Sequence, residues 1–258
     1  MKPTFVETSN VRRFMAALKT LDERGAVEAC MVVVDGKPGL GKTTTLSRWV
    51  AQTGSVYLRA QKGWDYSWFI QDLLTELSVS YQQIRGKRER FARVLQELQI
   101  RAEQAALEEK VFGLVIDECD LVSNRGEIME AIRGISDIQF MPTILVGMGR
   151  LRDNLRRFPQ IESRAPNKVE FLPASIEDVT ALVEGRCEVA VAPDLIAFVH
   201  RVSKGYTREI LDAIAAIERF GRRFEPGPGG VTLADMAGQP VMNDRSTGKP
   251  IMVPGGAA

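Results

Sequence analysis

The sequence predicts an α/β fold, with a parallel five-stranded sheet sandwiched by helices and followed by a small helical lid. Up to Pro173, short apolar runs alternate with longer stretches of helical period, which is the pattern of a parallel sheet with helices on its faces. After Pro173, helical stretches follow one another with no strand between them. A chain of 258 residues with 45% hydrophobic content can bury one sizeable core and a small second one.

Five short apolar runs are the expected strands: residues 30–34, 56–58, 111–116, 143–146 and 169–172. Six stretches of helical period accompany them: residues 10–24, 42–52, 68–78, 87–107, 127–136 and 151–158. Parallel strands need crossover connections, which helices usually supply. We therefore expect residues 1–173 to form one α/β domain.

The expected lid covers residues 174–222 and contains three helices, at 176–188, 194–202 and 207–222. Ser175 with Asp178 three residues later is a helix-start signature, because each side chain can accept the other residue's backbone N–H. Residues 223–258 are punctuated by glycine and proline. We expect this tail to bury little apolar surface and to be mobile or ordered by a partner.

Composition narrows the possible partners. The formal net charge is only +1, so the whole molecule offers no electrostatic argument for binding nucleic acid or a membrane. The first residues lack the apolar core of a signal peptide, and no apolar run approaches the roughly 18 residues that span a bilayer. We expect a soluble, cytoplasmic protein with no membrane partner. Its three distant cysteines suit reduced thiols, and the single histidine, His200, argues against a catalytic triad.

A phosphate-binding loop follows the first strand. It consists of Gly36, Lys37, Pro38, Gly39, Leu40, Gly41, Lys42 and Thr43. In such loops backbone N–H groups hold the phosphates, the lysine reaches the β- and γ-phosphates, and the hydroxyl of Thr43 faces Mg²⁺. The helix that follows, starting with Thr44 in its first turn, points its positive end at the same anion. The sequence therefore predicts a P-loop protein that binds ATP with Mg²⁺.

Two carboxylates end the third expected strand. Asp117 and Glu118 follow the apolar run 111–116, at the edge of the sheet where ligands bind in such folds. Asp117 is suited to hold Mg²⁺ directly or through water, and Glu118 to polarise the water that attacks the γ-phosphate. The alternative is a solvated acidic turn with no role in catalysis.

An arginine begins the last lid helix. Arg208 follows Gly205, Tyr206 and Thr207, and from the first turn of that helix an arginine can reach the phosphates of a nucleotide. An ordinary surface arginine is the alternative.

The order of these motifs over residues 5–220 resembles that of the AAA+ ATPases. The lead-in at 5–11, the strand end at 116–120 and the segment 142–147 look most like the transposition target-selection ATPases, the family of the phage Mu B protein, TniB and TnsC. The resemblance implies that ATP-bound subunits form a ring or helical filament on duplex DNA with little sequence preference, recruit a transposase and leave on hydrolysis. Similar motif sets occur in secretion-associated and replication-initiation ATPases, so a protein-assembly or signalling ATPase that binds no DNA is the alternative.

The resemblance also implies roles for single residues. Val6 and Asn10 fall where the lead-in meets adenine, although Asn10 could equally cap a helix. Arg208 falls at the lid sensor. Arg164 falls where a neighbouring subunit's arginine finger is expected. Four other arginines compete for that role: Arg150, Arg152, Arg156 and Arg157.

One segment departs from the family pattern. The fourth strand of AAA+ proteins usually ends in a polar residue that helps to hold the attacking water. Here it runs into Gly147, Met148 and Gly149, which offer no side-chain hydrogen-bonding group. We therefore expect slow hydrolysis, with ATP serving as an assembly switch.

Two basic segments are candidates for DNA contact. Arg59 and Lys62 follow the second strand, and Lys87, Arg88 and Arg90 begin a long helix. Such side chains neutralise phosphates and give salt-dependent binding without sequence preference. A solvated basic helix start is the alternative for the second group.

Overall fold

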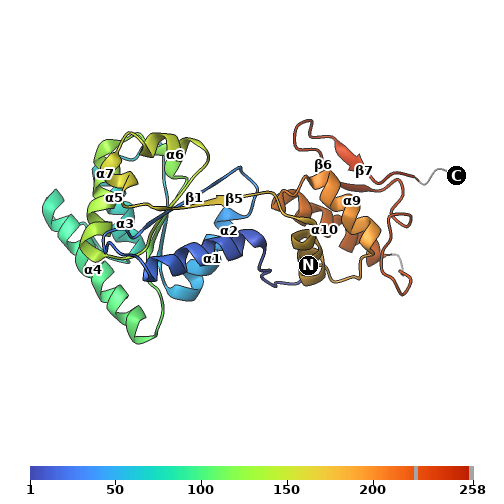
Figure 1. Ribbon diagram of the computed structural model, residues 1–258, viewed down its shortest axis with the longest axis horizontal. Helices are drawn as coiled ribbons and strands as arrows, with labels where there is room; N and C mark the ends of the chain where they lie inside the picture. The colour runs from blue at the N-terminus through green and yellow to red at the C-terminus, as the bar shows by residue number, and fades with distance from the viewer. Residues whose placement is uncertain (224–225, 256–258) are drawn as a thin grey trace. The chain divides into compact units, whose positions relative to one another are not determined.

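The computed structural model describes residues 1–223 and 226–255 (Figure 1). It contains two compact units. Unit 1 comprises Met1–Arg12, Pro38–Gly41 and Leu172–Ala258, and unit 2 comprises Arg13–Lys37 and Lys42–Phe171. None of the described helices combines the length and apolar character that crossing a membrane requires.

Unit 2 is built on a five-stranded sheet, which confirms the predicted α/β fold. Its strands are β1 (Met31–Gly36), β2 (Val56–Arg59), β3 (Leu114–Asp117), β4 (Thr143–Val146) and β5 (Asn167–Phe171). Their order is β2-β3-β4-β1-β5, and each neighbouring pair is parallel. Gly36, Arg59 and Asp117 therefore lie at the same edge of the sheet, with Arg59 in register with Asp117.

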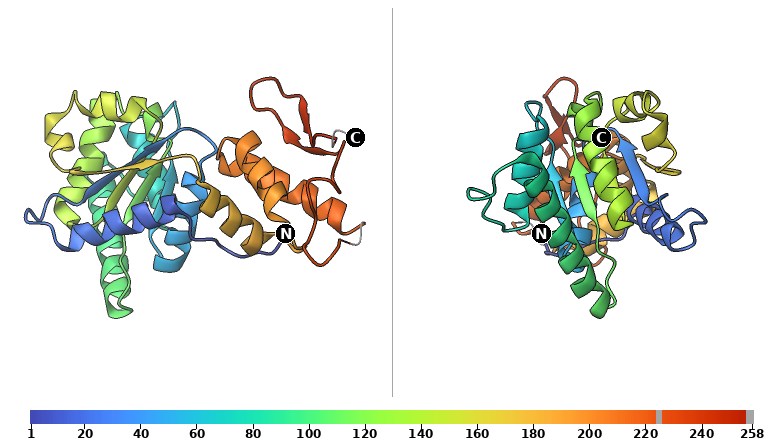
Figure 2. Two further views of the ribbon diagram at one scale, coloured as in Figure 1. Left: turned by 45° about the vertical axis from the view of Figure 1, so that its right-hand side comes forward. Right: turned by 90° about the vertical axis from the view of Figure 1, so that its left-hand side faces the viewer.

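Helices cover both faces of this sheet (Figure 2). They are α1 (Ser9–Asp22), α2 (Lys42–Thr53), α3 (Tyr66–Glu76), α4 (Lys87–Leu107), α5 (Gly126–Gln139), α6 (Arg150–Leu155) and α7 (Pro159–Glu162). Successive strand residues point to opposite faces. In β1, Val33 joins a core with residues of α3, α4 and α5, while its neighbours Val32 and Val34 are fully buried as well. A strand buried on both sides needs helices on both sides.

The helix predicted at 151–158 is present as α6, but it ends before residue 158 and a second short helix follows. α6 ends at Leu155 and α7 begins at Pro159. Proline disfavours helical backbone in the residue before it, here Phe158, and suits the first position of a new helix.

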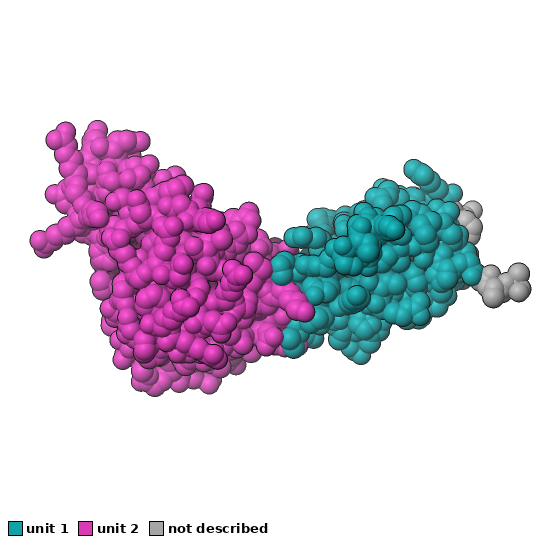
Figure 3. All heavy atoms as spheres, turned by 90° about the horizontal axis from the view of Figure 1, so that it is seen from above, with its two compact units in different colours: residues 1–12, 38–41, 172–258 teal, residues 13–37, 42–171 magenta. Residues whose placement is uncertain are grey.

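Unit 1, teal in Figure 3, contains the lid helices α8 (Ile176–Arg186), α9 (Pro193–Ser203) and α10 (Thr207–Gly221). The capping box predicted for Ser175 and Asp178 is present at the start of α8. A separate core joins the three helices through residues such as Val179, Val199 and Ile214.

The prediction that the tail buries little apolar surface is wrong. Residues 240–252 form an antiparallel hairpin of β6 (Pro240–Asn243) and β7 (Pro250–Met252). Val231, Val241 and Val253 are 0–1% exposed and join the core of the lid. These residues are widely spaced and follow no regular period, so the sequence does not reveal that they share a core. Residues 224–225 and 256–258 of the predicted tail lie outside the described residues, and the domain limits at 173 and 222 stay predictions.

Candidate nucleotide site

Lys42 lies at the start of α2, where its ammonium is directed back to the loop that precedes it. Its Nζ donates to the carbonyl oxygen of Gly36 at 2.5 Å and to that of Lys37 at 3.0 Å. Burial lowers the pKa of Lys42, and the nearby carboxylates, Asp117 foremost, oppose that shift. The ammonium is therefore partly desolvated, which strengthens its attraction for an anion.

Gly36 is required by the neighbouring strand. A Cβ atom at this position would lie 2.7 Å from the carbonyl oxygen of Phe171 in β5. The backbone φ angle of Gly36 is +149°. Any larger residue would push β1 and β5 apart at the point where the phosphate loop leaves the sheet. The atom closest to a Cβ at Gly36 thus belongs to β5.

Asp117 is held by two hydroxyl groups. Thr43 Oγ1 donates to Asp117 Oδ2 at 2.9 Å, and the phenol of Tyr57 donates to the same oxygen at 2.6 Å. Burial, with the bond to Asp117, raises the pKa of Tyr57 well above its ordinary value, so the phenol stays a donor. Sequence reasoning missed Tyr57, although one polar aromatic residue within a short buried strand is a detectable signal.

The pair of Thr43 and Asp117 fits Mg²⁺. Both candidate ligands are oxygen donors, and they lie within hydrogen-bond distance of one another. No cluster of three or more His, Cys, Asp or Glu among the described residues is arranged to hold a metal ion. Magnesium commonly takes one or two protein oxygens together with waters and nucleotide phosphates, so this sparse set suits it. Bound there, Mg²⁺ would neutralise charge on the phosphates.

Glu118 is paired with Arg59 at the end of the adjacent strand. The guanidinium Nη2 of Arg59 donates to Glu118 Oε1, and this bond raises the pKa of Arg59. Glu118 has left-handed backbone, with φ 54°, which is uncommon for a residue other than glycine. Glu118, the predicted general base, therefore lies beside Arg59, a predicted DNA contact.

Gly147, Met148 and Gly149 offer no polar side chain, as expected from the sequence, but a carboxyl group from another segment lies beside the end of β4. The turn after Glu118 places the side chain of Asp120 beside Gly147. The backbone N–H of Met148 donates to Asp120 Oδ2 at 2.5 Å. The other oxygen, Oδ1, is buried and has no hydrogen-bond partner among the described residues. Burial raises the pKa of Asp120. The end of β4 therefore lies beside a partly buried carboxyl group that the turn after Glu118 supplies.

Replacing Gly147 with alanine should destabilise the protein by about 1–3 kcal/mol. The added Cβ would lie 2.6 Å from Asp120 Oδ2 and 2.9 Å from Leu151 Cβ. Gly149→Ala is the matched control, because a Cβ there meets nothing within 4 Å. Urea unfolding of the two variants makes the comparison, and equal free energies of unfolding would contradict this packing.

Within unit 1, the tip of the phosphate loop contacts the first turn of α10. Arg208 N donates to the carbonyl oxygen of Gly39 at 3.1 Å, and a Cβ at Gly41 would lie 3.5 Å from Thr207 Oγ1. The side chain of Arg208 is exposed. These contacts bring the predicted lid arginine to residues 38–41 of the loop.

The two predicted adenine contacts have structural partners in unit 1. The Asn10 side-chain amide donates to Leu172 O at 2.8 Å and accepts from Leu172 N at 2.9 Å. Val6 packs on α8, where a Cβ added at Gly185 would lie 2.6 Å from Val6 Cγ2. Contact with adenine stays a prediction for both residues.

The predicted arginine finger is engaged within its own chain. Arg164 Nε donates to Asp137 Oδ1 of α5 at 3.0 Å, and its side chain is 27% exposed. Two of its competitors also have acidic partners, since Arg152 pairs with Asp35 and Arg156 with Asp153. Arg150 and Arg157 are exposed and have no ion-pair partner within the described part of the chain.

The residues predicted to contact DNA differ in whether their side chains already interact with other residues of the chain. Lys87 lies over the ring of Tyr66 at 5.4 Å and near Glu127, and Arg90 donates to Ile84 O at 3.0 Å. Lys62 and Arg88 are exposed. The structure therefore leaves Lys62 and Arg88 more available to a phosphate than Lys87, Arg90 and the paired Arg59.

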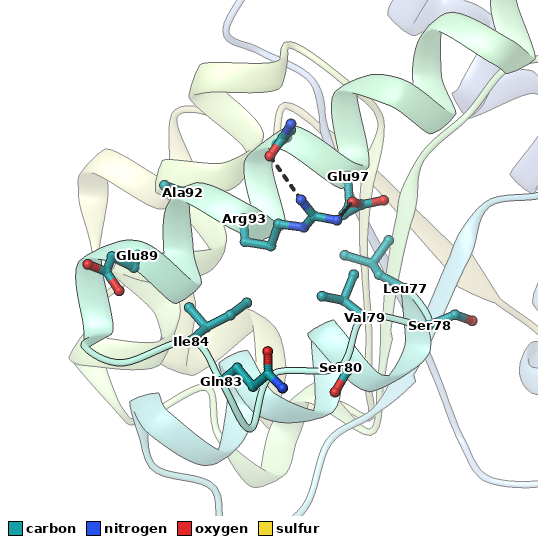
Figure 4. Close-up of a pocket in the computed structure, with 11 residues that line it drawn as sticks. Leu77, Ser78, Val79, Ser80, Gln83, Ile84, Glu89, Ala92, Arg93 and Glu97 are labelled. Carbon is teal, nitrogen blue, oxygen red and sulfur yellow. Dashed lines mark hydrogen bonds and ion pairs between the residues drawn. The ribbon is translucent and has the colours of Figure 1, made fainter.

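A groove of about 730 Å³ lies in unit 2 between the end of α3, the loop after it and α4 (Figure 4). Leu77, Val79 and Ile84 line it, and Arg93 reaches over it from α4. Arg93 pairs with Glu97 at 2.6 Å, so its charge is already compensated. The groove contains none of the phosphate-loop residues.

Comparisons with solved structures find the same fold in other proteins. Among solved structures, the chain is similar to the Aeropyrum pernix ORC2 protein in its ADPNP–ADP complexes, with a TM-score of 0.62 and 15% identity over 86% of this chain and 66% of that one. It is also similar to the Aeropyrum pernix ORC1 protein in complex with DNA, with a TM-score of 0.54 and 16% identity over 86% and 62%. A mutant of Thermotoga maritima RuvB gives a TM-score of 0.53 and 22% identity over 85% and 65%.

These identities show a shared fold, and the chain spans less than two thirds of the length of each of these structures. No curated protein matches the chain in sequence. The family model of the AAA domain matches residues 27–155, which is half of the 258-residue chain. The protein therefore belongs to the AAA domain family.

Proposed function

We propose that the protein hydrolyses ATP, binds duplex DNA without sequence preference, oligomerises on it in the ATP-bound state, and recruits or activates a transposase. Slow hydrolysis then controls disassembly. The transposase assignment rests on the resemblance of the lead-in and strand ends to the transposition target-selection family. DNA as a partner is supported in addition by the likeness to the ORC1 protein in complex with DNA.

The proposed roles at the nucleotide follow from the positions described above. Lys42 and the backbone of Gly36–Thr43 hold the phosphates, with Thr44 in the first turn of α2. Thr43 and Asp117 hold Mg²⁺, and Glu118 polarises the attacking water. Val6 and Asn10 contact adenine, and Arg208 reaches the phosphates from the lid. Arg164 serves a neighbouring subunit, which requires that it first leave Asp137.

The observation that carries the link to DNA is the pairing of Arg59 with Glu118. The bond from Arg59 occupies Oε1 of Glu118, an oxygen that would otherwise be open to take a proton from water. A DNA phosphate would compete with Glu118 for Arg59 and release the carboxylate. Hydrolysis would then be slow in free protein and faster on DNA.

A protein-assembly or signalling ATPase that binds no DNA is the second candidate. It is favoured by the intramolecular engagement of Lys87 and Arg90, which leaves the start of α4 with less free positive charge than the sequence suggests.

Replacing Arg59 with alanine separates the two candidates. We expect turnover without DNA to rise several-fold, because Glu118 loses its partner, and the stimulation by duplex DNA to be lost. Lys19→Ala removes an exposed cation from α1 and should change neither rate. ATP hydrolysis is measured for each variant with and without duplex DNA at fixed salt, since the salt concentration sets the affinity.

If wild-type hydrolysis does not respond to duplex DNA at low salt, the protein-assembly candidate replaces the first. If DNA stimulates wild type and Arg59→Ala equally, DNA acts through other residues and the proposed coupling is wrong.

A further inference from the structure

The C-terminal hairpin brings an arginine to the tip of the phosphate loop. Arg245 lies in the turn between β6 and β7, and its Nη2 donates to the carbonyl oxygen of Pro38 at 2.8 Å. Both residues belong to unit 1. Arg245 lies in the part of the sequence from which no role was predicted, and no nucleotide-binding motif points to it.

The position of Arg245 is fixed from several directions. Asp244, the residue before it, accepts from the backbone N–H and the hydroxyl of both Ser246 and Thr247, at 2.6–3.0 Å. These bonds hold the pKa of Asp244 well below its ordinary value. The guanidinium of Arg245 lies 4.2 Å from the centre of the Tyr206 ring, and its Nη1 donates to Glu209 Oε1 at 3.0 Å. A guanidinium with this many contacts is pre-organised for the bond to Pro38.

The loop is shaped to receive this side chain. A Cβ at Gly39 would lie 2.9 Å from Arg245 Nη1, and the φ of Gly39 is +87°. A glycine therefore lies where the guanidinium approaches the backbone. Next to it, Arg208 N donates to the carbonyl oxygen of Gly39 at 3.1 Å. Two consecutive carbonyl groups of the loop thus accept hydrogen bonds from the lid and its hairpin.

A bond to a carbonyl oxygen also sets the direction of an N–H group. The peptide unit is planar and trans, so its C=O and N–H point in opposite directions. The bond from Arg245 to Pro38 O orients the peptide whose N–H belongs to Gly39. The bond from Arg208 N to Gly39 O does the same for the N–H of Leu40. Phosphate loops bind anions through such N–H groups, and a charged donor on the carbonyl side polarises the peptide and strengthens its N–H as a donor.

We propose that Arg245 is a positioning residue of the nucleotide site, which orients the peptide between Pro38 and Gly39 and so makes nucleotide affinity depend on the C-terminal hairpin. This inference rests on the proposed binding of ATP by residues 36–43. Arg245 acts through the loop backbone, so its loss should weaken binding and leave the chemical step unchanged.

The test compares four full-length variants with wild type: Arg245→Ala, Arg245→Lys, Glu209→Gln and Lys249→Ala. We expect Arg245→Ala to raise KM for ATP and Kd for Mg-ADP about tenfold, the loss expected of one hydrogen bond from a charged group, with kcat within about twofold. Arg245→Lys keeps the charge but cannot bond Pro38 and Glu209 in the same fork geometry, so it should be intermediate. Glu209→Gln keeps an acceptor for Arg245 and should stay near wild type. Lys249, an exposed cation of the same hairpin, should be replaceable without effect.

ADP binding is followed by titration calorimetry, and folding of each variant by circular dichroism. Equal ADP affinity in wild type and in folded Arg245→Ala, or the same loss in Lys249→Ala, would overturn the inference. Arg245→Lys provides the same comparison if Arg245→Ala does not fold, and wild-type affinity in that variant would count against it. If wild-type protein binds no ADP, the proposed ATP site itself fails, which is a different outcome from wild-type binding that is insensitive to Arg245.

Discussion

Replacing Lys42 with alanine should weaken ATP binding by at least about a hundredfold and so abolish every ATP-dependent step. The ammonium is partly desolvated and lies within 2.5–3.0 Å of two loop carbonyls. A charged hydrogen bond is worth about 1.5–3 kcal/mol, and a partly buried cation facing phosphates interacts more strongly than an exposed one. Calorimetric titration with Mg-ADP measures the loss without interference from hydrolysis.

Lys37→Ala is the matched control for Lys42→Ala. Lys37 lies in the same loop, but its side chain is exposed and its carbonyl oxygen makes the bond to Lys42. We expect Lys37→Ala to keep most of the affinity, since alanine preserves that carbonyl. Comparable losses in the two variants would mean that total charge at the loop, and not the position of Lys42, determines binding.

Replacing Glu118 with glutamine should lower turnover about 10²- to 10⁴-fold, the usual contribution of a general base, and leave ATP affinity nearly unchanged. Glutamine has the same shape and can still accept the bond from Arg59, but it cannot take a proton from water. The ATP-bound assembly should therefore persist. Single-turnover hydrolysis and a nucleotide-binding titration separate the two effects.

Glu109→Gln provides the control for Glu118→Gln. Glu109 is exposed and also has left-handed backbone, with φ 55°, so the exchange repeats both the chemistry and the conformation at a site away from the sheet edge. It should turn over ATP like wild type. Wild-type turnover in Glu118→Gln would remove Glu118 from its proposed role.

The sheet and lid could be predicted because local pattern and tertiary structure agree there. The apolar runs of β1 and β4 are buried on both faces, and α4 has the predicted bounds. The C-terminal segment could not be predicted in the same way. Val231, Val241 and Val253 become buried only because α8, α9 and α10 provide a core to pack against, and a short-range pattern does not contain that information.

The residues of the candidate site also fall into those that the sequence predicts and those that it does not. Residues of the phosphate loop, Asp117 and Glu118 follow from contiguous motifs. Contacts that depend on strand order do not: Tyr57 and Arg59 meet Asp117 and Glu118 because β2 pairs with β3. Asp120 reaches Gly147 through a turn, and Arg245 reaches Pro38 through a hairpin. The motifs therefore identify the chemistry, and the tertiary contacts suggest how it is regulated.

The central claim, that ATP controls assembly on duplex DNA, is tested most directly by co-sedimentation of the full chain with duplex DNA. With Mg-ATP we predict a polymer that sediments with DNA of any sequence, weakens with salt and dissolves as ATP is hydrolysed; Glu118→Gln should remain on the DNA. With Mg-ADP we predict none. If Mg-ATP and duplex DNA produce neither a co-sedimenting polymer nor a change in the rate of hydrolysis, the claim is contradicted.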